Sequence, residues 1–269
     1  MNMKRFGAGA LLVLGMSLAT VAQAHRAWML PSATVLSGDN AWVTVDGAVS
    51  NSLFYFEYHP LQLDSLQILS PSGEAVDAQN RAKGRFRSTF DVELKEEGTY
   101  TLQMHRQGVF AFFKMDGKPT RWWGRADELD QIPVAAQDLR VSEVDRRMQV
   151  FVTRGAPTNA TFMPSGQGLE LVPLTHPNDL VTAEPVRFKF LLDGKPAAGL
   201  SGVLIRDGIR YRDRVDEIAL TTDGGGKVEV IFDEPGMYWL ELEAEQPSQV
   251  VEGAKRRLSY SATLEVLPL

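Results

Sequence analysis

The feature that most constrains this chain is a two-residue alternation of apolar and polar side chains that begins at Ala41 and recurs almost to the C-terminus. Short runs rich in β-branched and aromatic residues are separated by Gly, Pro, Asn and Asp, which is the pattern of strands joined by turns. No amphipathic helix is predicted in the first half, and one short helix or turn is expected at 126–129. We predict strands at 41–49, 53–58, 66–69, 86–94, 99–105, 169–174, 186–192, 203–205, 227–232, 238–244 and 260–267.

A repeated segment indicates two domains of the same kind. Gly98-Thr99-Tyr100 recurs as Gly236-Met237-Tyr238. This pattern resembles the tyrosine corner of sandwich domains, in which the ring packs inside and the hydroxyl satisfies a backbone group of a loop. We therefore expect an all-β fold of two tandem immunoglobulin-like β-sandwiches. The N-terminal domain would span 25–154, a linker without periodic apolar residues 155–168, and the C-terminal domain 169–269.

The first 24 residues have the features of a cleavable secretory signal peptide. Lys4 and Arg5 form a basic region, 7–21 form a short apolar region, and Ala22-Gln23-Ala24 supplies a small-x-small cleavage site. The apolar region is shorter than the roughly 20 residues of a spanning helix. We predict cleavage after Ala24, export to the periplasm and a mature chain that begins with His25 and does not span the membrane. A retained N-terminal anchor is the alternative.

Composition excludes several classes of protein. The chain has no cysteine, so it has no disulfides, and a soft-metal site would have to use His, Met or carboxylate groups. The predicted signal peptide removes two of the 28 basic residues and none of the 34 acidic ones, which leaves a formal charge of 26 minus 34, or −8. There is no basic stripe for nucleic acid. No Ser-His-Asp order, carboxylate pair or His-Glu-x-x-His motif is present, so we do not expect an enzyme.

The chain has only four histidines, and three of them suggest a metal site. Cleavage after Ala24 would give His25 a free α-amine, which can chelate a metal ion together with the ring Nδ1. His59 and His105 lie at the ends of predicted strands in the same sandwich. If those strand ends meet, His25, His59 and His105 would form a nitrogen-rich site for nickel, cobalt, copper or zinc. Further ligands could come from Met29, Met104 or Glu57.

Each of these residues could instead have an ordinary structural or surface role. On the predicted strand 99–105, Tyr100, Leu102 and Met104 share one face, so His105 points to the other. His59 and His105 could each be an ordinary surface residue. His176 is expected in a solvated loop. The aromatic residues near the middle of the chain could stack on a sugar, but core or interdomain packing is favoured; these residues are Phe110, Phe112, Phe113, Trp122 and Trp123.

Several motifs resemble a family of proteins of unknown function, DUF4198. They are the opening Ala24-His25-Arg26-Ala27-Trp28-Met29-Leu30-Pro31, then Gly98-Thr99-Tyr100, Leu169-Glu170-Leu171-Val172-Pro173 and Asp193-Gly194-Lys195-Pro196. The resemblance covers essentially the whole mature chain. It implies an exported periplasmic component associated with cobalt or nickel uptake. The leading hypothesis is therefore a transition-metal-binding protein, not an enzyme, that passes its metal ion to a membrane uptake complex.

Two other functions remain open at this point. A copper oxidase of the lytic polysaccharide monooxygenase type also begins with a mature histidine, and here His59 or His105 would be its second ring ligand. Trp122 and Trp123 would then form a surface for sugar stacking. A metal-free sandwich module that binds or adheres through its edges and loops is the third possibility, because a fold alone does not determine function.

Overall fold

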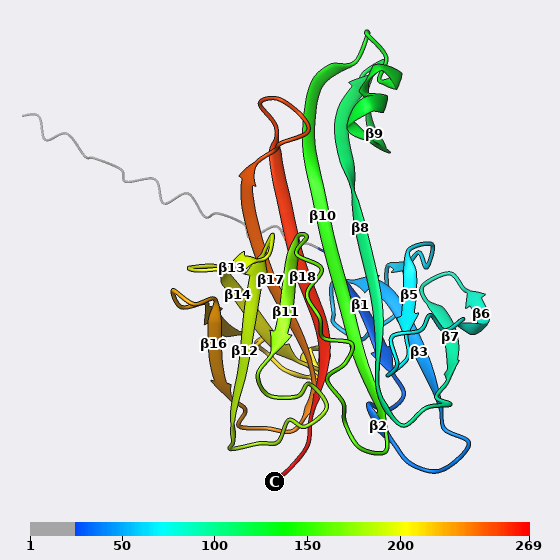
Figure 1. Ribbon diagram of the computed structural model, residues 1–269. Coiled ribbons are helices and arrows are strands. Elements are labelled where there is room, and N and C mark those ends of the chain that lie inside the picture. Colours follow the sequence, from blue (N-terminus) through cyan, green and yellow to red (C-terminus); the bar gives the residue numbers. More distant parts are fainter. Residues whose placement is uncertain (1–24) are drawn as a thin grey trace, which may run out of the picture.

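The structure is a computed structural model that describes residues 25–269, and most of these residues lie in strands (Figure 1). The expected signal peptide, 1–24, lies outside the described residues. No helix in the described part of the chain is long and apolar enough to cross a membrane. The strands are β1 (Arg26–Pro31), β2 (Val35–Leu36), β3 (Trp42–Ser50), β4 (His59–Pro60), β5 (Leu66–Leu69), β6 (Gln79–Lys83), β7 (Ser88–Glu93), β8 (Gly98–Met115), β9 (Lys118–Gly124), β10 (Gln137–Arg154), β11 (Leu169–Pro173), β12 (Pro185–Leu192), β13 (Lys195–Pro196), β14 (Ser201–Arg206), β15 (Ile218–Thr221), β16 (Lys227–Ile231), β17 (Gly236–Pro247) and β18 (Lys255–Val266). Two short 3-10 helices are η1 (Ala126–Gln131) and η2 (Ile209–Tyr211).

The strands form three sheets, and the largest sheet joins both halves of the chain. Its nine strands follow the order β15-β14-β17-β18-β10-β8-β5, with β2 also paired to β10 and β9 to β8. We call it the central sheet. The halves meet in the parallel pair β10–β18, which runs from Ser142 beside Lys255 to Val150 beside Thr263. A five-stranded sheet contains β1, β3, β4, β6 and β7, and a four-stranded sheet contains β11, β12, β13 and β16.

The two smaller sheets pack on opposite faces of the central sheet, because alternate residues of β10 enter different cores. Val150 and Val152 belong to the core under the five-stranded sheet. Phe151, between them, belongs to the core under the four-stranded sheet. Figure 1 shows these smaller sheets on the two sides of the long strands. The all-β sandwich architecture is confirmed, but the two sandwiches share one sheet, which the expectation of tandem sandwiches did not include.

Most predicted strands are present, including 66–69 at its predicted bounds. The strand predicted at 53–58 is wrong, because this segment is a turn. Phe54 adopts the left-handed conformation with φ 63°, and the backbone N–H of Ser52 donates to the Glu57 carboxylate (2.6 Å). The alternating aromatics Phe54 and Phe56 instead pack around the buried Trp28. The strands that were not predicted are β1, β2, β4, β6, β9, β10, β13 and β15.

Both expected tyrosine corners are formed. The hydroxyl of Tyr100 accepts a hydrogen bond from the Glu96 backbone N–H (2.7 Å), and the hydroxyl of Tyr238 donates to the Glu234 carbonyl (2.7 Å). In both cases the partner lies four residues earlier and the glycine two residues before the tyrosine has a positive φ. The repeated Gly-x-Tyr motif therefore corresponds to a repeated local structure.

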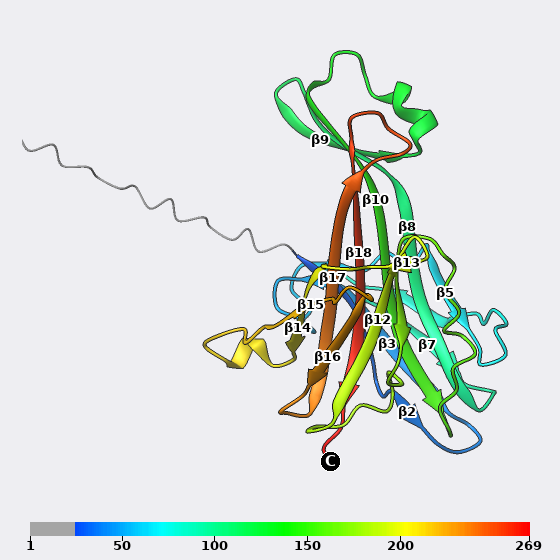
Figure 2. The ribbon, with the colours of Figure 1, turned by 60° about the vertical axis from the view of Figure 1, so that its left-hand side comes forward.

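Strands β8, β9 and β10 and the β17–β18 hairpin extend beyond both sandwiches, with η1 near the tip (Figure 2). One face of this extension has a small core in which Phe113 packs with Ile132, next to Trp122. Core packing is therefore the role of Phe113 and Trp122. Trp123 lies on the other face of β9, against Gly108, where a Cβ atom would come within 2.8 Å of the indole ring.

Candidate ligand cavity and metal-ligating residues

A cavity of about 1410 Å³ lies on the face of the central sheet that carries the five-stranded sheet. Its floor consists of two rows of side chains that cross β17, β18, β10 and β8 in that order. The first row is Glu241, Ser261, Met148 and Met104. The second row is Glu243, Ser259, Arg146 and Arg106. Because cross-strand partners share a face and the rows are two residues apart, all eight side chains point into the same space.

The walls come from segments distant in sequence. The start of β1 brings His25 and Arg26 to the cavity, and β4 brings His59. Beside Arg26 the lining continues into the loop 215–217, whose Glu217 forms an ion pair with Arg26 (Nη2–Oε1 2.9 Å). Arg26 also lies over the indole of Trp239 at 5.5 Å, which fixes the start of β1 against β17. His25, the residue before Arg26, is thereby positioned in the lining of the cavity.

The structure brings His25 and His59 together around one aromatic ring. The imidazole of His25 stacks on Tyr58 with the ring centroids 3.7 Å apart, and the ring of His59 lies 4.2 Å from the same tyrosine. Both histidines are exposed. Nδ1 of His25 lies 2.6 Å from Oδ1 of Asn51, and because an amide oxygen only accepts, Nδ1 carries the proton in this contact. Two imidazoles are thus available to a ligand in the cavity.

His105 lies apart from the other two, on the opposite face of the central sheet. Its Nε2 is 2.8 Å from Oδ1 of Asp145, and its Nδ1 is 3.3 Å from an Arg147 nitrogen. Arginine can only donate, so Nδ1 accepts and Nε2–H donates to Asp145. Both ring nitrogens are therefore engaged within the protein. His105 lies within β8 rather than at a strand end, and it does not meet His25 and His59 at the cavity.

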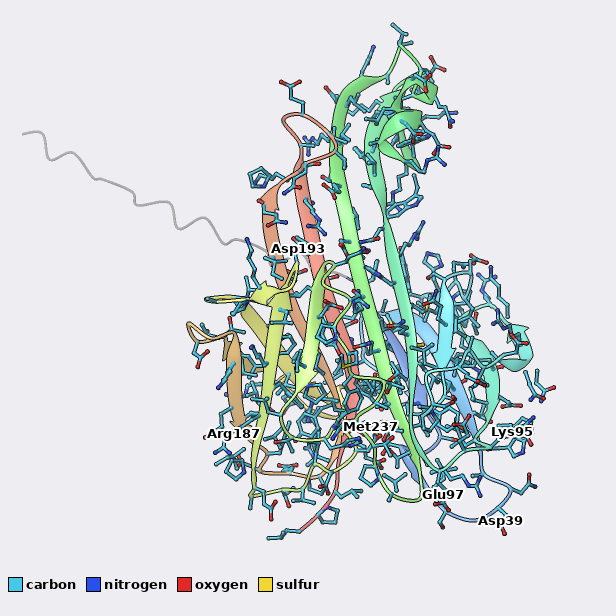
Figure 3. All side chains as sticks on the ribbon, viewed as in Figure 1. Asp39, Lys95, Glu97, Arg187, Asp193 and Met237 are labelled. Carbon is cyan, nitrogen blue, oxygen red and sulfur yellow. The ribbon has the colours of Figure 1, made fainter. Side chains whose placement is uncertain are left out.

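His105 belongs to a cluster that we call the buried charge network, in which every member except the exposed Asp193 is buried or half-buried: His105, Asp145, Arg147, Glu170, Asp193 and Arg256. Arg256 bridges Asp145 and Asp193, with both Nη–Oδ2 distances at 2.7 Å. Figure 3 labels Asp193 at the upper end of the C-terminal sandwich, beside the long strands. Burial alone raises the pKa of Asp145, but hydrogen bonds from His105, Gln107 and Arg256 outweigh it and hold this pKa at about 2.

His176 also has a structural role, because both of its ring nitrogens are hydrogen-bonded within the protein. Nδ1 accepts from the Asn178 backbone N–H (3.0 Å), and Nε2 lies within hydrogen-bond distance of Thr99 and of the Thr158 carbonyl. Burial lowers the pKa of His176. The ring therefore connects the end of β8 with the segment 155–168. The expectation of a solvated loop histidine was wrong.

The cavity also contains a carboxyl group with a strongly shifted pKa. Burial raises the pKa of Glu241 to about 7, the neighbouring Glu243 adds to the rise, and Arg26 and Arg146 oppose it. At neutral pH this carboxyl therefore holds a proton more readily than an exposed glutamate does. Within residues 25–269, no three His, Asp or Glu side chains lie close enough together to hold a metal ion as they stand.

Sequence reasoning found His25, His59 and Met104 but missed most of the cavity floor. The missed residues are Arg106, Arg146, Met148, Glu241, Glu243, Ser259 and Ser261. A signal did exist, because charged residues in the middle of a strand interrupt the apolar alternation of β10. That signal identifies an open face, but it does not say which strands lie side by side.

Comparisons with solved structures give only distant similarities. A DUF4785 family protein from Legionella pneumophila matches with 11% identity over 80% of this chain and 50% of its own, at a TM-score of 0.25. Escherichia coli alpha-2-macroglobulin activated by porcine elastase matches with 14% identity over 91% and 20%, at 0.24. The D0-D1 domain of intimin matches with 9% identity over 89% and 97%, at 0.23. The chain thus spans half of the Legionella protein and a fifth of the macroglobulin.

No curated protein sequence matches the chain significantly. A family of domains of unknown function, DUF4198, does match, over residues 22–246. This range begins before His25 and ends in β17, so it contains His25, His59 and most of the cavity floor. The chain belongs to the DUF4198 family.

Proposed function

We propose that this protein binds a transition-metal ion in the periplasm and serves as an accessory component of nickel or cobalt uptake. The observation that carries the proposal is the placement of His25 and His59 around Tyr58 at one cavity. Cleavage after Ala24 would add the α-amine of His25 to this set. Export and cleavage are part of the proposal, because the chelating amine exists only in a processed chain.

The donor groups suit such an ion. Imidazole and amine nitrogens are good ligands for nickel, cobalt, copper and zinc. Carboxylates of Asp64 and Glu217 line the same cavity and could add oxygen donors. Metal binding through Nδ1 of His25 would require the ring to leave Asn51 and to carry its proton on Nε2 instead. The α-amine of a processed chain would have to lose a proton to bind the metal, so affinity should increase with pH.

His105 is not part of the proposed site, because its two ring nitrogens already serve Asp145 and Arg147. We further propose that 25–154 and 169–269 are two immunoglobulin-like units joined by 155–168. The C-terminal unit would dock on a membrane uptake complex. This division is compatible with a shared sheet, since each unit has its own core.

Titration calorimetry of the processed protein with nickel, cobalt, copper and zinc tests the proposal. At least one ion should bind with micromolar affinity or better, and His25→Ala and His59→Ala should each weaken it by about tenfold or more. A chain with one extra alanine before His25 is the matched control. It keeps every side chain of the protein, but the free α-amine then belongs to the alanine and no longer to His25. Binding no tighter than about millimolar for all four ions would refute the proposal.

The same two imidazoles and Tyr58 would also serve the copper oxidase alternative. That function requires copper with an open coordination position and reaction with peroxide and a reductant. The copper-loaded protein should therefore be assayed on polysaccharides with both reagents. Turnover that is lost in His25→Ala would favour the oxidase over the uptake function.

A further inference from the structure

We propose that Arg106 and Arg146 form an anion subsite in the cavity, which binds the carboxylate groups of a small chelator that carries the metal ion. The proposal rests on the proposed metal-binding function for the identity of the ligand. The subsite itself is argued from the central sheet alone.

The two arginines are direct cross-strand partners on the cavity face of β8 and β10. Like charges in this position destabilise a sheet unless something neutralises them. Within residues 25–269, neither guanidinium forms an ion pair with a carboxylate. On the opposite face Arg256 bridges two aspartates. Arg106 and Arg146 thus present their positive charge to the cavity rather than to the protein.

In the part of the chain that the structure describes, Arg106 is held in place without using its hydrogen-bond donors. Its guanidinium lies 3.9 Å from the ring centroid of Trp123. Trp123 in turn rests against Gly108, since any Cβ there would come within 2.8 Å of the indole. Stacking on an aromatic ring leaves the in-plane N–H groups of arginine free for bidentate binding of a carboxylate. The next strand adds a hydroxyl at the same level, Ser259 beside Arg146.

The charges in the cavity are separated along the row. Arg106 and Arg146 lie at the β8–β10 end, and Glu243 lies at the β17 end, with Glu241 in the adjacent row. Such a site fits a ligand that has a cationic centre and anionic arms. A divalent ion chelated by a polycarboxylate has this form, with its metal centre toward the acids and its free carboxylates toward the arginines.

The cavity is large enough to hold a chelate and not only a bare ion. Its volume of about 1410 Å³ exceeds the ~300 to 1,000 Å³ of ordinary small-molecule sites. A chelate would leave room for water at the mouth. Arginine–carboxylate hydrogen bonds are charge-assisted and are among the stronger polar contacts of proteins.

Titration calorimetry of the full processed chain tests the subsite with four probes: nickel alone, citrate alone, the nickel–citrate complex and inorganic phosphate. We expect the complex to bind most tightly. Arg106→Gln and Arg146→Gln should each weaken it by about tenfold to a hundredfold, with nickel alone unchanged. Arg140→Gln is the matched control, because Arg140 lies on β10 outside the cavity and should have no effect. Thermal unfolding checks that each variant is folded, and Arg146→Lys should restore part of the binding.

The outcomes separate the subsite from the metal function. Equal binding of nickel–citrate by the wild type and by a variant that carries both Arg106→Gln and Arg146→Gln, with nickel bound normally, would overturn the subsite alone. Arginine-dependent binding of citrate with no nickel binding would support the anion subsite and refute the metal function. Phosphate binding tighter than citrate binding would overturn the assignment to carboxylates.

Discussion

The two faces of the central sheet carry charges in opposite ways, although the same strands supply both. On one face the buried charge network pairs each charge with an opposite one. On the other face Arg106, Arg146, Glu241 and Glu243 line a cavity. Asp145 and Arg146 are consecutive residues of β10, yet they belong to these two different environments. Adjacent residues of one strand therefore have different surroundings: Asp145 is buried among its charged partners, and Arg146 lines the cavity.

The difference follows from the cost of removing charge from water. Asp145 is only 2% exposed, and an unpaired carboxylate there would be strongly unfavourable. Three donors surround it, so the charge is retained and its pKa is low. The cavity face keeps contact with solvent, which allows unpaired arginines to persist. Buried charge on one face has to be paired, whereas accessible charge on the other face stays in contact with solvent.

The largest effect is expected from breaking the buried charge network. Asp145→Ala leaves Arg256 and His105 without their central acceptor. Removing one partner of a buried pair typically costs about 3 to 5 kcal/mol in the free energy of unfolding, which urea denaturation would measure. Glu243→Ala on the cavity face is the control, with an expected change of about 0.5 kcal/mol or less. Similar losses for both variants would contradict the contrast between the two faces.

Much of the fold was predictable because it follows local patterns. The strand at 66–69 and both Gly-x-Tyr corners depend only on side chains close in sequence. Strand β10 was missed because Glu143, Asp145 and Arg146 interrupt its apolar alternation. The segment 53–58 alternates for a different reason, since its aromatics surround Trp28 from a turn.

The candidate site was predictable only in part. Strand periodicity correctly placed His105 on the face opposite Met104. Strand periodicity could not predict that His25 and His59 lie on the same face of the central sheet as Met104. Their position depends on how β1 and β4 pack on that sheet. The pair Arg106 and Arg146 likewise depends on a register between strands 40 residues apart (146 minus 106). Local pattern determines which face a residue occupies, and tertiary pairing determines which residues share it.

A second prediction uses the opposite pKa shifts on the two faces. The raised pKa of Glu241 means that the folded state holds its proton more tightly than the unfolded chain does. Its contribution to stability is therefore fully present below about pH 4.5 and is lost as the pH rises through about 7. Asp145 has the reverse sign, because its contribution is present above about pH 4 and is lost as the pH falls toward 2.

Glu241→Gln should remove the first of these dependences. We compare the unfolding free energy of the variant with that of the wild type at each pH. The difference, variant minus wild type, should be about 2 to 3 kcal/mol larger at pH 8 than at pH 5, because each pKa unit corresponds to ~1.4 kcal/mol. Urea denaturation at both pH values measures the difference, and taking it between the two proteins cancels the histidines common to both. An identical pH dependence for the two proteins would show that the carboxyl of Glu241 is not destabilised by burial.

The smallest expected effect is the sharpest test of the contrast, because it compares two adjacent arginines of β10. Arg147 is buried, donates to the Gln167 carbonyl (3.1 Å) and approaches Glu170 (3.6 Å), so Arg147→Gln should cost about 1.5 to 3 kcal/mol. Arg146 is exposed and faces Arg106 across the strand pair. Arg146→Gln should change the unfolding free energy by less than about 0.5 kcal/mol, and the change should be toward higher stability, because a like-charge neighbour is removed. A loss of 1 kcal/mol or more on Arg146→Gln, in protein free of anions, would mean that this arginine serves the fold and would remove the argument that its charge is reserved for a ligand.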